Sequence, residues 1–280
     1  DDGIAALAWT NYLSSLDFDR AYFLGADIEE FRRHETDVDD MLKAGELDFA
    51  YYVFERFKQR VQDRYDYVTE LLDKGFELTR DEEYAWKRKD SRWPRDRDEW
   101  NELWRKKIKN EYLRLLVARE MSLDSAEEDT AEEPGDAEEP PADVVRRRYR
   151  QVLTVMNDSD ADWVLQKFLS AVAQAYDPHS SYMSPSALED FDIEMKLSLV
   201  GIGALLRAED GAAKVVRLIP GGPADRDKRD IALQPGDKII AVAQDDGEPV
   251  DILHWPLSKV VRLIRGEKGT AKSTAVRGLA

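Results

Sequence analysis

Two glycines one residue apart, Gly201 and Gly203, interrupt an apolar run at residues 197–206. Glycine at these positions lets the backbone turn tightly and leaves the neighbouring amides uncovered by side chains. The N–H groups of Ile202, Gly203 and Ala204 are then able to converge on an anion, such as the terminal carboxylate of a peptide. The same spacing also fits an ordinary turn at the entry to a strand, so the glycine pair alone leaves both interpretations open.

A second chemical possibility is the pair His179 and Ser180, a base beside a hydroxyl nucleophile. Adjacent residues rarely present both side chains to one substrate, and no third group that would orient the histidine stands out. We therefore interpret residues 177–185 as a structural turn and assign no catalytic residue to this chain. The sequence has no cysteine, and its histidines, His34, His179 and His254, lack metal-ligand spacing, so no metal or cofactor is predicted.

The composition limits the classes of function. A chain of 280 residues with 42% hydrophobic residues is long enough for about two domains with cores of their own. The net charge of −17 predicts repulsion from nucleic acids and from anionic membrane surfaces. No apolar run approaches the ~20 residues that span a bilayer. The chain opens with Asp1 and Asp2, without a start methionine or signal sequence, which predicts that it begins inside a longer precursor.

The first half of the chain has the periodicity of helices. The clearest helix is predicted between residues 49 and 72, where one apolar stripe precedes a stop at Gly75. Capping boxes are predicted at Asp27 with Glu30, Thr79 with Glu82, Asp96 with Glu99, and Ser159 with Asp162. The seven tryptophans invite a stacking or carbohydrate site, but their helical spacing favours packing.

Residues 122–143 carry ten acidic residues, no basic residue and few apolar ones. Such a segment cannot bury enough surface to offset the entropy of ordering it, so we expect a disordered loop between two helices. A decoy for a basic partner is the less favoured interpretation.

After Gly203 the period becomes that of strands. Strands are predicted at 204–207 and 214–219 around an Asp-Gly turn, with a further strand near 238–242. A helix follows at 257–264, and a poorly alternating closing strand beyond residue 270. The predicted fold class is α+β: a mostly helical domain at 1–195, then a small β-sandwich or barrel with two helices at 196–280, incomplete at its C-terminal end.

Three motifs in this second region resemble the PDZ domain of the carboxy-terminal processing serine proteases. They are Gly-Gly-Pro-Ala at 221–224, Leu-Gln-Pro-Gly-Asp-Lys-Ile-Ile-Ala-Val at 233–242 and Val-Val-Arg-Leu-Ile-Arg-Gly-Glu-Lys-Gly-Thr at 260–270. Asp-Pro-His-Ser-Ser-Tyr-Met-Ser-Pro at 177–185 resembles the segment before that domain. Tyr-Leu-Ser-Ser-Leu-Asp-Phe-Asp-Arg at 12–20, Trp-Pro at 93–94 and Leu-Trp-Arg-Lys-Lys-Ile-Lys at 103–109 are similar to the helical region of the tail-specific branch.

The resemblance implies a substrate-recognition portion of a bacterial periplasmic serine endopeptidase, with a location peripheral to the inner membrane as one option. It implies binding of protein or peptide C-termini, with the carboxylate at the amides of Ile202, Gly203 and Ala204. An apolar pocket is expected between Leu199, Ile202 and Leu205 and the helix residues Val260, Val261 and Ile264.

The family's catalytic serine and lysine follow the PDZ domain, and this chain ends before that region, so the chain alone is predicted to be inactive. An envelope adaptor protein is a further possible partner. The alternatives are a free-standing PDZ adaptor that binds peptide C-termini without catalysis, and a holdase-like helical domain.

Overall fold

The computed structural model describes residues 1–125, 139–185, 187–188, 191, 195, 201–209, 211–229, 232–244, 248–265 and 272–277. The chain divides into two compact units, Asp1–Ser184 and Pro185–Ala280. The first is helical and the second contains an antiparallel sheet, so the predicted α+β class is confirmed. The division falls before the boundary expected at residue 195.

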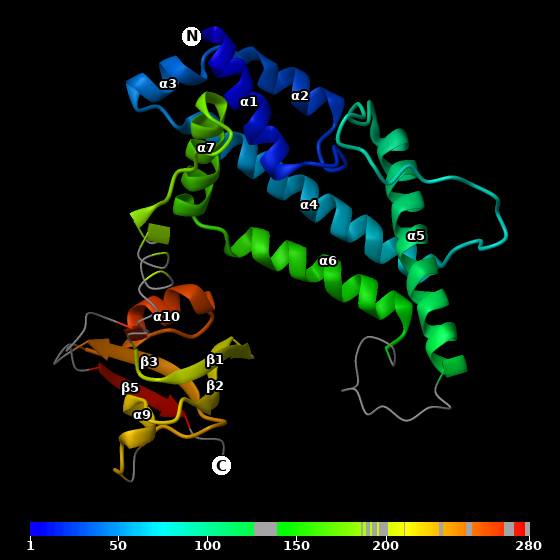
Figure 1. Ribbon diagram of the computed structural model, residues 1–280. Coiled ribbons are helices and arrows are strands. Elements are labelled where there is room, and N and C mark those ends of the chain that lie inside the picture. Colours follow the sequence, from blue (N-terminus) through cyan, green and yellow to red (C-terminus); the bar gives the residue numbers. More distant parts are fainter. Residues whose placement is uncertain are drawn as a thin grey trace. The chain divides into compact units, whose positions relative to one another are not determined.

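The helical unit is organised around one long helix, α4. Its helices are α1 (Asp2–Leu16), α2 (Gly25–Phe31), η1 (Arg32–His34), α3 (Val38–Ala44), α4 (Asp48–Lys74), α5 (Arg97–Ser125), α6 (Pro141–Asp158) and α7 (Ala161–Tyr176). Figure 1 shows α4 running between α1 and α7 at one end and α5 and α6 at the other. The first half of α4 contributes Phe57 and Val61 to one hydrophobic core, and its second half contributes Val68 and Leu72 to another.

The predicted helix at 49–72 is therefore confirmed, including its stop, where Gly75 has a φ of 75° and its amide bonds the carbonyl of Leu71. A 27-residue helix with one continuous apolar stripe can serve two cores because the stripe stays on one face along its length.

The capping predictions had mixed outcomes. Asp96 caps α5 by accepting the amide hydrogen of Glu99 at 2.9 Å, as predicted. The Thr79 box is wrong, because no helix begins there in the described connection between α4 and α5. The last box is shifted by one residue, since Asp160 rather than Ser159 accepts from the amide of Trp163.

Asp27 is not the first cap of its helix but lies inside the first turn of α2. Its carboxylate accepts the amide hydrogen of Leu24 at 2.9 Å and pairs with Arg56 and Arg60. The predicted box with Glu30 is therefore wrong: Glu30 accepts from the hydroxyl of Tyr52 instead. The buried carboxylate joins α2 to α4.

The helices on either side of the acidic segment extend into it. Helix α5 continues to Ser125 and α6 begins at Pro141, so the expected loop at 122–143 is too long at both ends. The remainder of that prediction, residues 126–138, lies outside the described residues.

Two polar nodes hold the end of α1 against the rest of the helical unit. The buried carboxylate of Asp17 accepts the amide hydrogens of Ala21, Tyr22 and Phe23 at 2.8 to 3.1 Å, and the indole N–H of Trp93 at 3.0 Å. Burial raises the pKa of Asp17, while these hydrogen bonds act in the opposite direction. The Asp-Phe-Asp sequence at 17–19 therefore follows the end of α1 as a hydrogen-bonded loop.

The second node is the carbonyl of Ala21. It accepts hydrogen bonds from the indole nitrogens of Trp100 and Trp104, both at 2.7 Å. Both rings are fully buried, so their N–H groups need internal acceptors. One loop carbonyl thus satisfies two tryptophans on successive turns of α5.

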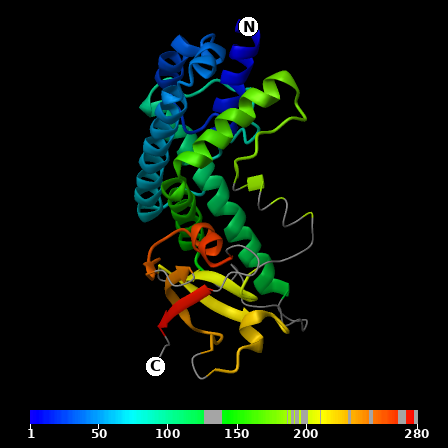
Figure 2. The ribbon, with the colours of Figure 1, turned by 90° about the vertical axis from the view of Figure 1, so that its left-hand side faces the viewer.

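The sheet unit contains β1 (Ala204–Glu209), β2 (Ala212–Leu218), β3 (Lys238–Gln244), β4 (Val250–Asp251) and β5 (Lys272–Arg277), with the helices α9 (Pro223–Arg226) and α10 (Leu257–Arg265). The described strands form one antiparallel sheet in which β2, β4 and β5 all pair with β3, and β1 pairs with β2. Helix α10 packs on one face of this sheet (Figures 1 and 2).

Most of these elements were predicted. The hairpin is confirmed, with strands somewhat longer than expected at their turn ends. The strand expected beyond residue 270 forms as β5 and pairs along the whole of β3. The two-residue strand β4 was not predicted, because Val250 and Asp251 are too short a run to show alternation.

Candidate functional site

The loop before β1 has its carbonyls occupied and its amides open. The carbonyl of Gly203 accepts from the amide of Ile219, and that of Ile202 accepts from the amide of Ala224, both at 2.8 Å. Among the described residues, the amides of Ile202 and Gly203 donate to no acceptor. Ala204 follows as the first residue of β1 and pairs with Leu218. The loop therefore leaves donors beside the start of a strand.

Two glycines allow the loop to approach the segment before α9. Gly203 has a φ of 75°, and a Cβ atom there would lie 3.0 Å from Cα of Gly222 and 3.2 Å from Cδ of Pro223. A Cβ atom on Gly222 would in turn lie 3.0 Å from the carbonyl oxygen of Ile219. Any larger residue at position 203 would be strained and would push the two segments apart.

Strand β1 lies at the edge of the sheet. Its strand partner within the described residues is β2, so the other side of β1 presents unpaired backbone groups. Its side chains alternate: Ala204 and Leu206 pack with the core of the unit, whereas Leu205 is 46% exposed. An extended peptide can add to such an edge through main-chain hydrogen bonds.

The predicted pocket residues of α10 occupy two environments. Val260 and Ile264 are buried in the core of the sheet unit, with exposed fractions of 1% and 3%. Val261 is only half-buried. Ile202 packs against the same core from the loop, which joins the loop to α10 through one hydrophobic cluster.

The two remaining residues predicted to line the pocket are Leu199 and Leu205. Leu199 lies outside the described residues. Leu205 points away from the cluster that contains α10, and Leu206 takes its place. The period of two from Ile202 through Ala204 was the signal that would have identified Leu206 rather than Leu205.

Sequence reasoning also missed two residues on α10. Leu257 packs against the core of the sheet unit at the start of the helix. At the other end, Cγ of Arg265 lies 3.7 Å from where a Cβ atom of Gly201 would be. Leu257, Val261 and Arg265 are four residues apart and so share one side of α10, a spacing that was visible in the sequence.

The pair His179 and Ser180 has an orienting neighbour that the sequence analysis did not identify. Asp177 contacts Nδ1 of His179 at 3.0 Å and accepts its amide hydrogen at 2.9 Å. The imidazole side chain is 92% exposed, and among the described residues no hydrogen bond joins it to the hydroxyl of Ser180. The amide of Ser180 instead closes a turn onto the carbonyl of Asp177. These contacts are those of a surface turn.

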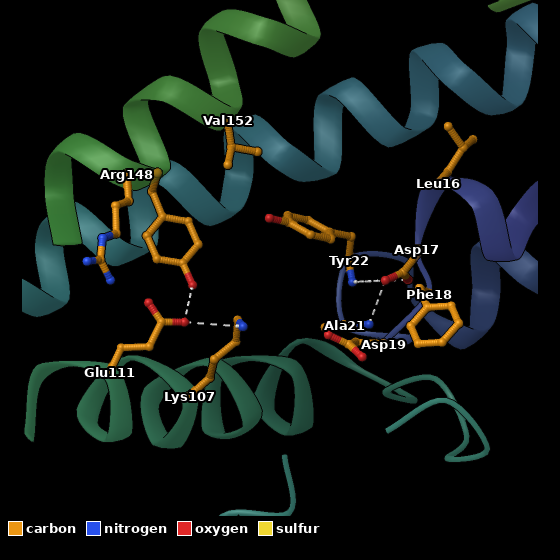
Figure 3. A pocket seen from close by; sticks show the side chains of 11 residues that line it. Leu16, Asp17, Phe18, Asp19, Ala21, Tyr22, Lys107, Glu111, Arg148 and Val152 are labelled. Atoms are coloured by element: carbon orange, nitrogen blue, oxygen red, sulfur yellow. Dashed lines mark hydrogen bonds and ion pairs between the residues drawn. The ribbon is translucent and has the colours of Figure 1, made fainter. Parts of the chain in front are cut away.

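The helical unit has an open pocket of about 410 Å³ between the loop after α1 and the helices α5 and α6 (Figure 3). On one wall, Glu111 accepts from the hydroxyl of Tyr149 at 2.8 Å and lies 3.3 Å from the ammonium group of Lys107. On the other wall, Asp17 is engaged by the loop amides. None of the residues predicted for peptide binding lines this pocket.

Within the described residues, no cluster of histidine and carboxylate side chains has the arrangement of a metal site. In the same part of the chain, every helix is too short or too polar to cross a bilayer.

Comparisons with known proteins agree with the motifs. A family model described as the tail specific protease N-terminal domain matches residues 1–186. A tail-specific protease of Haemophilus influenzae is 33% identical over 272 residues, which are 96% of this chain and 36% of that protein. The carboxy-terminal processing protease CtpA of Bacillus subtilis is 31% identical over 130 residues, 46% of this chain and 26% of that protein.

The chain is also 39% identical to a crystallised PDZ domain of the carboxy-terminal protease from Vibrio cholerae in complex with a peptide, which it matches over 29% of its own length and 81% of that chain, with a TM-score of 0.28. The chain spans about a third of the Haemophilus protein's length and about a quarter of the Bacillus protein's. The match to the family model extends over most of the chain, and the Haemophilus relative over nearly all of it. The chain therefore belongs to the tail-specific protease family.

Proposed function

We propose that the sheet unit binds the free C-terminus of a protein or peptide in the PDZ manner. The terminal carboxylate accepts hydrogen bonds from the amides of Ile202, Gly203 and Ala204, and the peptide backbone pairs with the open edge of β1. The last side chain, which is apolar, lies against Ile202 and Leu206. The observation that carries this proposal is that the carbonyls of Ile202 and Gly203 are bonded while, among the described residues, their amides have no acceptor and β1 has no partner strand on its outer side.

The helix α10 completes the proposed binding site. Val261 and Leu257 border it with apolar surface, while Val260 and Ile264 support the helix from the core. The Cγ atom of Arg265 lies beside Gly201, at the end of α10 next to the loop. A carboxylate is favoured there over a neutral group because charge-assisted hydrogen bonds are shorter and stronger.

In the whole protein, this site would select substrates for a serine endopeptidase of the bacterial periplasm, peripheral to the inner membrane. Support comes from the Haemophilus and Bacillus relatives, both of which are named as proteases. The catalytic serine and lysine would lie beyond Ala280, and the chain by itself would not cleave peptides. A coding sequence that continues past Ala280 without such a pair would favour the alternative, a PDZ adaptor.

The test compares two peptides that differ only at the terminus. A peptide with an apolar last residue should bind the 280-residue chain as the free acid, and its amide should bind about ten- to a hundredfold more weakly, the equivalent of ~1.5 to 3 kcal/mol. Isothermal titration calorimetry of both forms, in a sample whose folding is verified by circular dichroism, gives this ratio directly. Equal affinities would refute the carboxylate site.

Substitution of Gly203 by valine should abolish the preference for the acid, because the strained β-branched residue displaces the loop and covers its amides. The matched control is Gly221→Val, which also replaces a glycine with positive φ but meets only the tip of the Arg226 side chain, at 3.9 Å. The control should retain the ratio of acid to amide affinity.

A further inference from the structure

Trp86 is the exception among the tryptophans of the helical unit. It is 67% exposed, whereas Trp100 and Trp104 are fully buried, so the expectation that helical spacing packs the tryptophans is wrong at this position. Trp86 lies in the connection between α4 and α5, residues 76–96, which we call the strap. Figure 1 shows the strap in cyan to teal beside α5.

The first part of the strap is fixed to α5 by ion pairs. Glu82 pairs with Arg105 and accepts from Nζ of Lys109 at 2.7 Å. Lys109 is 4% exposed and also donates to the carbonyl of Arg80. These partly buried contacts fix the strap to α5 at Glu82, four residues before Trp86.

The last part of the strap is fixed to the loop after α1. The indole of Trp93 donates to Asp17 at 3.0 Å, and the carbonyl of Pro94 accepts from the amide of Gly25 at 2.7 Å. The guanidinium of Arg20 lies 4.6 Å from the centre of the Trp93 ring. Because both ends are fixed, the middle of the strap is held in place although it makes few contacts of its own.

That middle part presents aromatic rings together with lysines. The ammonium group of Lys87 lies 4.9 Å from the centre of the Trp86 ring, and that of Lys89 lies 5.8 Å from the ring of Phe18. Phe18 is itself 59% exposed, and Figure 3 shows its ring on the side of the pocket away from Glu111. We call Phe18, Trp86, Lys87 and Lys89 the aromatic–basic cluster.

The lysines of the aromatic–basic cluster are free of carboxylates. Among the described residues, neither Lys87 nor Lys89 has an acidic side chain within ion-pair distance. The strap as a whole contains six basic and six acidic residues, but residues 84–95 contain five basic residues and one acidic residue. Arg92 and Arg95 pair with Glu99, so the excess of positive charge is confined to residues 87–89 in the middle of the strap.

We propose that the aromatic–basic cluster binds the anionic headgroups of a lipid bilayer. Exposed tryptophan and phenylalanine rings suit the interfacial layer, and lysine stems cover apolar surface while their ammonium groups reach phosphates. The net charge does not prevent this contact, because at physiological salt the field of distant charges is screened beyond about 8 Å. This inference reverses the expectation from net charge and is independent of the peptide site.

The test is flotation of the 280-residue chain with vesicles of three parts phosphatidylcholine to one part phosphatidylglycerol. The chain should float with these vesicles, remain unbound with pure phosphatidylcholine, and dissociate in about 1 M salt, where the screening length falls to ~3 Å. The double variant Lys87→Gln and Lys89→Gln should bind about thirtyfold more weakly, at ~1 kcal/mol for each lysine. Trp86→Ala should weaken binding roughly tenfold, because the ring no longer removes apolar area from water.

The controls change residues of the same types elsewhere on the helical unit. Lys74→Gln removes an exposed lysine at the end of α4, and Tyr176→Ala removes a 69% exposed aromatic residue at the end of α7. Both should bind like the unaltered chain. Failure of the unaltered chain to float, or equal loss in cluster and control variants, would overturn the proposal. Binding to polyglutamate but not to vesicles would overturn it in favour of an acidic protein partner.

Discussion

The two units of this chain treat their backbone polar groups in opposite ways. In the helical unit, the carboxylate of Asp17 accepts four N–H groups and the carbonyl of Ala21 accepts two indoles, so the donors around the end of α1 are paired. In the sheet unit, the amides of Ile202 and Gly203 have no acceptor among the described residues. The first arrangement stabilises the fold, and the second leaves the donors on which the proposed carboxylate site depends.

The hydrophobic cores of the two units also differ in the kind of side chain that fills them. The helical unit is built from aromatic rings in edge-to-face contact, such as Tyr12 with Phe168 and Tyr22 with Trp104. The buried residues of the sheet unit's core are aliphatic. Edge-to-face contacts between large rings stabilise the helical unit. The binding site proposed for the sheet unit depends instead on the amides of Ile202 and Gly203, which have no acceptor among the described residues.

The largest expected effect is on the aromatic core. Trp104→Ala removes a fully buried ring whose N–H bonds Ala21, and should lower the free energy of unfolding of the helical unit by about 3 to 5 kcal/mol. Circular dichroism at 222 nm would follow this unit, and hydrogen–deuterium exchange of the β1, β2 and β3 amides would follow the sheet unit. Unfolding of both together would show that the two units are not independent.

A smaller loss of stability is expected when the hydrogen bonds accepted by Asp17 are removed. Asp17→Ala leaves three buried or part-buried amides and one indole without their acceptor, and should cost about 2 to 4 kcal/mol. Asp19→Ala is the matched control, because Asp19 is exposed and should change stability by less than about 0.5 kcal/mol. Chemical denaturation of both variants gives the comparison, and similar values for the two would refute the role of the node.

Two glycines of the sheet unit separate the cost of backbone strain from the cost of a close contact. Gly203→Ala combines strain at positive φ with a contact 3.0 Å from Gly222, and should cost about 2 kcal/mol or more. Gly236→Ala adds a Cβ atom at a φ of 98° with nothing within 4 Å, so only the strain of about 1 kcal/mol is expected. An equal loss in both variants, measured by denaturation, would mean that the approach of the two segments is not tight.

The smallest effect is a pH dependence of the helical unit. Hydrogen bonds from Arg105 and Lys109 lower the pKa of Glu82 below its usual 4.5. A lowered pKa stabilises the fold above the unfolded value, and this contribution is lost as the pH falls below 4.5 towards the folded value. Glu82→Gln should therefore flatten the acid limb of a plot of melting temperature against pH, while Glu83→Gln, an exposed neighbour, should not. An unchanged limb in Glu82→Gln would contradict the ion-pair assignment.

Helices and strands with a strong period could be predicted from the sequence. The stripe from Phe49 to Leu72 and the Asp-Gly hairpin are local signals, and both correspond to observed elements. Features set by distant partners could not be predicted. Glu82 resembles a capping residue in the sequence, but its partners are Arg105 and Lys109, more than twenty residues away.

In the candidate site, the glycine spacing at 201–203 and the alternation of β1 are both local signals. Leu205 was named because the period of two from Ile202 through Ala204 to Leu206 was overlooked, and the structure leaves Leu205 exposed. Trp86 was expected to pack in the core because the helical spacing of the tryptophans favoured packing. Trp86 is exposed because the contacts of Glu82 with Lys109 and of Trp93 with Asp17 fix the two ends of the strap. These contacts cannot be predicted from the residues of the strap alone.

The open edge of β1 has a consequence for the protein in concentrated solution. Unpaired strand edges invite pairing with the same edge of another molecule, which leads to aggregation. Here a bulge between Leu205 and Leu206 distorts the edge, and the exposed Arg207 pairs with Glu209 at 2.6 Å near its end. A bulge and charges of this kind disfavour a long, flat intermolecular ribbon. In the proposed binding mode, a peptide C-terminus needs only a short stretch of edge, so the bulge and the charges would permit peptide binding while disfavouring edge-to-edge pairing of two molecules.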